Sequence, residues 1–135
     1  MLTFLIYILC YDIYYYFLHI LLHTKYLYPI HKIHHKKYNP DYYDFYTIHI
    51  LEIPLQSVGL IIPVYFYKLA IYQLLCAIFI INIRGILIHD KRFINIIGDH
   101  HLLHHKFIKY NYGEYWIDYL FNTHYITKNI PTIKN

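Results

Sequence analysis

The chain has 135 residues, enough for one domain around one core. Hydrophobic residues make up 58% of it and aromatic residues 21%, but only 15% are charged, below the roughly one quarter usual in soluble domains. This composition argues against a soluble globular protein and for a membrane environment. The formal net charge is +4, but no basic stripe on a recognisable nucleic-acid fold accompanies it, so we expect no nucleic-acid partner.

Residues 1–24 form the first apolar stretch, which is long enough to span a bilayer. It lacks the basic start and the small-residue cleavage site of a signal peptide. We predict one helix from near the N-terminus to about Tyr28, where Pro29 ends it. A second predicted helix begins near Ile30 and runs toward Pro40.

Two further apolar stretches, 47–67 and 69–88, have almost no sequence between them, so they predict a membrane-spanning hairpin with a short turn. Prolines in the first arm predict a kinked or partly re-entrant helix. The remaining sequence is mostly polar and aromatic. It predicts a helix across His100–Lys109, a turn at Asn111–Gly113 and a short amphipathic helix near Glu114–Phe121.

These elements predict an all-α fold with a single domain over residues 1–135, in which an integral-membrane helical bundle carries a histidine-rich helical cap. The cap consists of segments 25–46 and 89–135, which hold nearly all lysines and arginines. The positive-inside rule places both segments in the cytosol. We therefore expect a protein of an endoplasmic reticulum-type membrane, with its functional site facing the cytosol.

Eight of the 12 histidines fall into three tight clusters, one H-x-x-x-H and two copies of H-x-x-H-H. A spacing of three or four residues is one helical turn, so the imidazoles of a cluster share a helix face. Neutral imidazole is the commonest metal ligand in proteins. The eight histidines are His19, His23, His31, His34, His35, His101, His104 and His105.

The number of clustered histidines predicts two metal ions, each with about four or five ligands, because a structural zinc site needs only four. Ligation by nitrogen alone suits iron, zinc, copper or nickel. The competing interpretation is a histidine-rich surface with adventitious metal affinity. The spacing favours a dimetal site held by the cap.

Three segments carry a resemblance to a known family. They read DIYYYFLHILLHTKYLYPIHKIHH at Asp12–His35, HHLLHHKFIKYNYG at His100–Gly113 and DYLFNT at Asp118–Thr123. These segments resemble the first two histidine boxes, the last box and the D-x-L-F-G-T ending of the fatty acid hydroxylase/sterol desaturase superfamily, with Asn122 in place of glycine. Members of this superfamily are integral-membrane, histidine-rich di-iron oxygenases.

The resemblance implies an enzyme that uses two iron ions and O2 to hydroxylate or desaturate a membrane lipid, a sterol or a fatty acyl chain, in lipid biosynthesis. Zinc can replace the iron ions in a purified protein. The resemblance also implies an external electron donor such as cytochrome b5 with an NAD(P)H reductase. The chain lacks a glycine pattern for binding nicotinamide or flavin, which agrees with an external donor.

The resemblance adds His89 as a ninth metal ligand, at the cytosolic end of the third apolar stretch. Some members carry a further histidine one turn earlier, where this chain has Gly85. Metal-bound imidazoles need partners for their other ring nitrogen. The residues predicted to support the ligands in this way are Asp12, His49, His100 and Asp118.

Within the superfamily the sterol C5-desaturase branch is the nearest, because His49, Glu52 and Gln56 in HILEIPLQ resemble a histidine–glutamate–glutamine segment there. Two alternatives stay open. The first is an inactive or truncated member of the family, because the chain is short for a member and a homo-oligomer would have to complete its site. The second is a zinc-binding membrane scaffold without redox activity.

Overall fold

Three long helices hold most of the apolar sequence: α1 (Phe4–Leu22), α3 (Glu52–Phe66) and α4 (Ile71–Ile88). They belong to a computed structural model that describes residues 4–67 and 70–126. Within those ranges the chain forms helices and no strands, which confirms the predicted all-α fold. The parts of the predicted apolar stretches and cap at 1–3, 69 and 127–135 lie outside the described residues.

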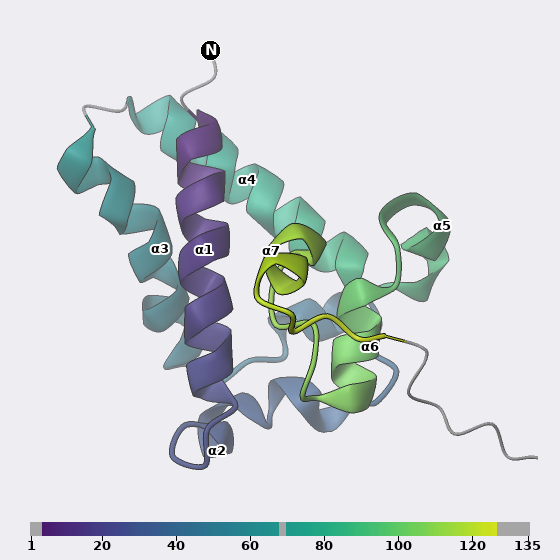
Figure 1. Ribbon diagram of the computed structural model, residues 1–135. Helices are drawn as coiled ribbons and strands as arrows, with labels where there is room; N and C mark the ends of the chain where they lie inside the picture. The colour runs from purple at the N-terminus through teal and green to yellow at the C-terminus, as the bar shows by residue number, and fades with distance from the viewer. Residues whose placement is uncertain (1–3, 68–69, 127–135) are drawn as a thin grey trace, which may run out of the picture.

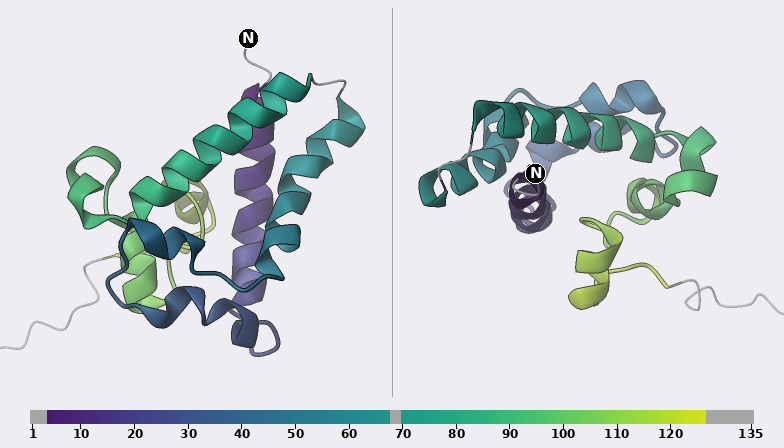
Figure 2. Two further views of the ribbon diagram at one scale, coloured as in Figure 1. Left: turned by 180° about the vertical axis from the view of Figure 1, so that it is seen from behind. Right: turned by 90° about the horizontal axis from the view of Figure 1, so that it is seen from above.

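Helix α1 stands at the centre of the bundle (Figure 1). Helices α3 and α4 both pack on α1 but scarcely touch each other. Seen from above, α3 and α4 lie on one side of α1 and α7 lies on the other (Figure 2). By length and composition, α1 and α4 are apolar enough to cross a membrane, and α3 is a shorter apolar helix.

Seven short elements form the cap at one end of the three long helices. Three of them connect α1 to α3, two connect α4 to α6, and α6 and α7 form the far side of the cap (Figure 1). The elements are α2 (Tyr28–His31), η1 (His34–Lys36), η2 (Tyr42–Tyr46), η3 (Lys91–Phe93), α5 (Ile94–Ile97), α6 (His100–Phe107) and α7 (Tyr115–Leu120).

The predicted boundary between the first two helices is wrong. Helix α1 already ends at Leu22, and Pro29 lies in the first turn of α2 instead of ending a helix. A proline is well placed there, because the first turn of a helix has no use for its missing N–H. The predicted second helix is also interrupted, since α2 stops at His31 and a 3₁₀ turn follows at His34–Lys36.

Element η2 is held against α4 by a close approach at Gly85. A Cβ atom at this position would lie 2.1 Å from the ring of Phe45, so a larger residue has no room while the ring stays there. The ring of Phe45 in turn lies 5.7 Å from the imidazole of His89. Gly85 therefore allows the loop between η1 and α3 to cover the cap end of α4.

Candidate metal centre

Nine histidines converge in the cap in two groups, and the ligand nitrogens within each group lie within 4.8 Å of one another. The first group has five members and joins the end of α1 to α2, η1 and α6. The second has four and joins η1 and the end of α4 to α6. The first group is His19, His23, His31, His35 and His104; the second is His34, His89, His101 and His105.

The division between the groups follows the helical spacing. Histidines four residues apart stay together: His19 with His23, and His101 with His105. Adjacent histidines separate, so His34 joins the second group and His35 the first. This is what a helical turn requires, because side chains four positions apart share a face and neighbours do not. One short helix or turn thereby contributes donors to both groups.

Backbone carbonyls fix the orientation of several imidazoles. The Nδ1–H of His104 donates to the carbonyl of Tyr110 at 2.6 Å, and that of His89 donates to the carbonyl of Gly85 at 2.6 Å. His19 donates in the same way to the carbonyl of Tyr112. A carbonyl oxygen only accepts, so the ring proton lies on Nδ1, and the neutral ring turns the lone pair of Nε2 toward the group.

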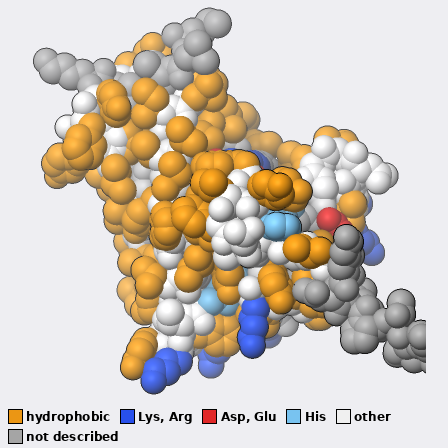
Figure 3. All heavy atoms as spheres, viewed as in Figure 1, with side chains coloured by type: hydrophobic (Ala, Val, Ile, Leu, Met, Phe, Trp, Pro, Cys, Tyr) orange, Lys and Arg blue, Asp and Glu red, His pale blue; other side chains and the backbone are white. Residues whose placement is uncertain are grey.

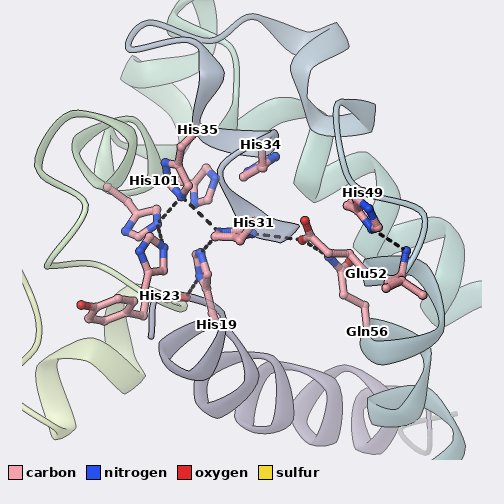
Figure 4. Close-up of polar contacts among 12 residues, drawn as sticks. His19, His23, His31, His34, His35, His49, Glu52, Gln56 and His101 are labelled. Atoms are coloured by element: carbon pink, nitrogen blue, oxygen red, sulfur yellow. Dashed lines mark hydrogen bonds and ion pairs between the residues drawn. The ribbon is translucent and has the colours of Figure 1, made fainter. Parts of the chain in front are cut away.

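The convergent nitrogens fit a cation. In the first group, His31 Nε2 lies 2.9 Å from His19 Nε2 and 3.1 Å from His35 Nε2 (Figure 4). In the second group, His89 Nε2 lies 3.1 Å from His34 Nε2 and 3.0 Å from that of His101. Hydrogen bonds cannot satisfy so many lone pairs directed at one another, whereas a metal ion between them can. The buried Nε2 of His105 has no hydrogen-bond partner, which also fits a ligand atom.

Burial keeps these imidazoles neutral. It lowers the pKa of His23 and of His105 to about 3, and neighbouring imidazoles add to the effect. Burial also lowers the pKa of His89 to about 4 and holds that of His101 and His104 well below the usual value. Neutral imidazole is the form that binds metal, so the folded cap presents its donors ready for ligation at physiological pH.

Glu52 supports the first group from α3. Its Oε2 lies 3.0 Å from His31 Nδ1, and both side chains are fully buried (Figure 4). Gln56, one turn along the helix, donates to the same carboxylate at 3.5 Å. A carboxylate on the outer nitrogen of a metal-binding imidazole fixes the ring and raises its basicity. Glu52 was part of the sequence resemblance but was not predicted to support a ligand; the signal was a lone carboxylate within an apolar run, which needs a partner.

Asp118 supports the site through the loop that precedes α7. Its fully buried carboxylate accepts from the backbone N–H groups of Tyr112 at 2.9 Å and Gly113 at 2.8 Å, and from Thr123 Oγ1 at 2.6 Å. It also lies 3.0 Å from His100 Nε2. The carbonyl of Tyr112 is the acceptor for His19, so Asp118 holds the loop that orients this imidazole.

Two predicted supporting residues lie away from the imidazole groups. Asp12 forms an ion pair with Arg84 of α4, and Arg84 Nε also lies 3.1 Å from Glu114 Oε1. This three-residue cluster ties α1, α4 and the loop before α7 together. His49 lies outside both groups, and its Nδ1 accepts from the backbone N–H of Leu51 at 3.2 Å (Figure 4).

A cavity of about 400 Å³ lies beside the second group. His34, His89 and His101 line it, whereas the first group reaches it through Glu52. Its volume falls in the range of small-molecule sites, and most of its lining surface is apolar. The apolar walls come from α3, α4, η2 and the segment between η2 and α3, and they include Phe45, Ile48, Ile53, Leu60, Ile78, Ile81 and Ile88.

The fold and the site define an all-helical protein with apolar, membrane-length helices and a cap that gathers nine imidazoles beside an apolar cavity. Residues 4–123 match the fatty acid hydroxylase family, so the chain belongs to this family. The match confirms the resemblance to the fatty acid hydroxylase/sterol desaturase superfamily. No curated protein and no solved structure matches the chain significantly.

Membership supports a lipid hydroxylase or desaturase type of oxidoreductase that depends on metal, acts on lipid and associates with membranes. The two histidine groups are able to hold metal ions. The two apolar helices agree with membrane association.

Proposed function

We propose that the protein is a membrane-bound di-iron oxidoreductase that uses O2 to hydroxylate or desaturate a lipid. The observation that carries the proposal is the position of the second histidine group, which lies in the wall of an apolar cavity between α3 and α4. The family supplies the lipid class of substrate. All nine histidines act as ligands in this proposal, within one domain.

Two iron ions held by the two groups would supply the activation of dioxygen that attack on an unactivated C–H bond requires. The protein residues position the reactants. The isoleucines of α3 and α4 hold an alkyl chain and exclude water. His34, His89 and His101 lie where that chain meets the cap. Glu52 and the carbonyls of Tyr110 and Tyr112 keep their imidazoles oriented.

The partners follow from the family and from the charge distribution. We propose that the cap faces the cytosol at an endoplasmic reticulum-type membrane, because it carries nearly all of the lysines and arginines. Electrons come from an external donor such as cytochrome b5 with its NAD(P)H reductase. We also propose that the protein forms a homo-oligomer.

The sterol C5-desaturase branch is the proposed place within the family. Two of the three residues that suggested it lie at the site: Glu52 binds His31, and Gln56 binds Glu52. Both also line the cavity. A residue pair that touches a ligand and the cavity is suited to influence the choice between hydroxylation and desaturation.

Metal analysis tests the di-iron centre. Protein expressed with ample iron and purified in detergent is expected to contain about two iron atoms per chain, since nine imidazoles supply two ligand sets of four and five. Elemental analysis by mass spectrometry measures the ratio. A single zinc ion per chain, unchanged when iron is supplied during expression, would contradict the proposal and favour the zinc-binding scaffold.

Lipid analysis tests the reaction. Expression in yeast that lacks its own sterol and sphingolipid hydroxylases is expected to yield a lipid with a new hydroxyl or a new double bond, detected by mass spectrometry. A new sterol double bond would support the C5-desaturase branch, and a new hydroxyl would place the protein among the hydroxylases. An unchanged lipid profile from protein that holds two iron atoms would favour an inactive member of the family.

A further inference from the structure

Helix α7 presents an unusual surface to the outside of the cap. Its inward face is formed by Ile117 and Asp118, which are 1% and 0% exposed. Its outward face is uncharged and strongly aromatic, although the helix belongs to the polar end of the molecule. The exposed large residues of α7 and the residue after it are Tyr115, Trp116, Tyr119, Leu120 and Phe121.

This aromatic face is continuous with the apolar outside of α1. Exposed side chains recur on α1 at every fourth residue and form one stripe along the helix: Leu5, Leu9, Ile13, Phe17 and Leu21. The ring of Phe121 stacks on Tyr16 at 5.2 Å and meets the edge of Phe17 at 5.6 Å. The surface of α7 therefore extends sideways from the stripe that a membrane-spanning α1 turns toward lipid.

The contact between Phe121 and Phe17 lies within the membrane-length part of α1, not beyond its end. Phe17 precedes the last residue of α1, Leu22, by five positions, which is about 7 Å along a helix axis. Exposed basic side chains occur beyond the end of α1 instead, at Lys25, Lys32 and Lys36. Figure 3 shows hydrophobic side chains over α1 and α7 and most of the visible basic side chains along the lower edge of the cap.

We propose that α7 lies in the bilayer interface, with Trp116, Tyr119 and Leu120 in contact with lipid. Tyrosine and tryptophan favour that depth, because their rings are apolar and their polar atoms reach water. The exposed side of this helix carries no charge, because Asp118, the only charged residue of α7, is buried. Because the aromatic face of α7 continues the apolar stripe of α1, lipid is the partner that covers both.

The position of α7 has a consequence for the cavity. The loop before α7 supplies Tyr112, Gly113 and Glu114 to the cavity wall. With α7 in the interface, this part of the cap is sunk below the membrane surface. An alkyl chain then reaches the second histidine group without leaving the bilayer. The contact of α7 with the bilayer does not depend on the metal chemistry, so it can be tested by a separate measurement.

The chain contains a single tryptophan, so Trp116 reports on α7 directly. The full-length protein is reconstituted in phosphatidylcholine vesicles, and its tryptophan emission is measured with brominated lipids and with aqueous iodide. We expect brominated lipids to remove most of the emission, with bromine near the headgroup more effective than bromine near the chain end. Iodide is expected to have little effect.

The matched control moves the tryptophan to the basic side of the cap. In the double variant Trp116→Phe with Tyr26→Trp, the new tryptophan replaces a residue that is 78% exposed beside Lys25. Iodide is expected to quench this variant and brominated lipid is not. Quenching of Trp116 by iodide alone would overturn the proposal. Protection of Trp116 from both quenchers would also overturn it and would assign the face to a second copy or to another protein.

Discussion

Replacement of His104 with alanine is expected to lower lipid oxidation by more than about 100-fold and to reduce the iron content of the protein. Changing a residue that merely supports a metal ligand costs about 10- to 100-fold in affinity or activity, and loss of a ligand costs more. His104 is fully buried, and its Nε2 lies 3.1 Å from the Nε2 atoms of both His23 and His35. Product formation and metal content are measured on the same preparation.

The matched control is His49→Ala, which removes an imidazole that lies outside both groups. It is expected to keep two iron atoms and most of the activity. Membrane insertion of both variants is compared by extraction with alkaline carbonate, because α1 and α4 keep the length and composition to cross a membrane in either variant. Unchanged turnover in His104→Ala would remove the last histidine cluster from the reaction.

Replacement of Asp118 with alanine is expected to destabilise the cap by about 3–5 kcal/mol. The carboxylate accepts from the N–H groups of Tyr112 and Gly113 and from Thr123, and each buried donor left without a partner costs about 1–3 kcal/mol. The loop then no longer fixes the carbonyl that orients His19, so iron binding weakens as well. Thermal unfolding in detergent and metal content measure the two effects.

The control for this change is Asp99→Ala. Asp99 is exposed and precedes α6, but its side chain does not cap the helix. A surface substitution of this kind usually changes stability by less than about 0.5 kcal/mol. Equal losses of stability in the two variants would show that the hydrogen bonds of Asp118 do not hold the loop.

The sequence predicted the helical fold, the approximate positions of the long helices and the family. These features depend on local pattern: runs of apolar residues and histidines one turn apart. The prediction was less accurate between residues 22 and 36, where one continuous helix was expected before Pro29. Local propensity does not show that the chain must turn early so that His23 and His31 reach the same group.

The supporting contacts around the imidazoles were the least predictable part of the site. The carbonyls of Tyr110, Tyr112 and Gly85 orient three imidazoles, and every residue has a carbonyl, so no side-chain pattern marks them. Asp12 was expected to support His19, two turns further along the same face of α1, but the structure pairs it with Arg84 of α4, 72 positions away in the sequence. Its partner depends on how α1 and α4 cross.

The sequence by itself determined which side chains are available as metal donors and which of them share a helix face, because both follow from residue type and from the helical repeat. Only the tertiary structure decided how those faces combine. His34 and His35 are neighbours in the sequence, yet they belong to different groups, because the end of α4 brings His89 to His34 and the end of α1 brings His23 to His35. The same packing opens the cavity beside the second group, since α3 and α4 both rest on α1 but scarcely touch each other.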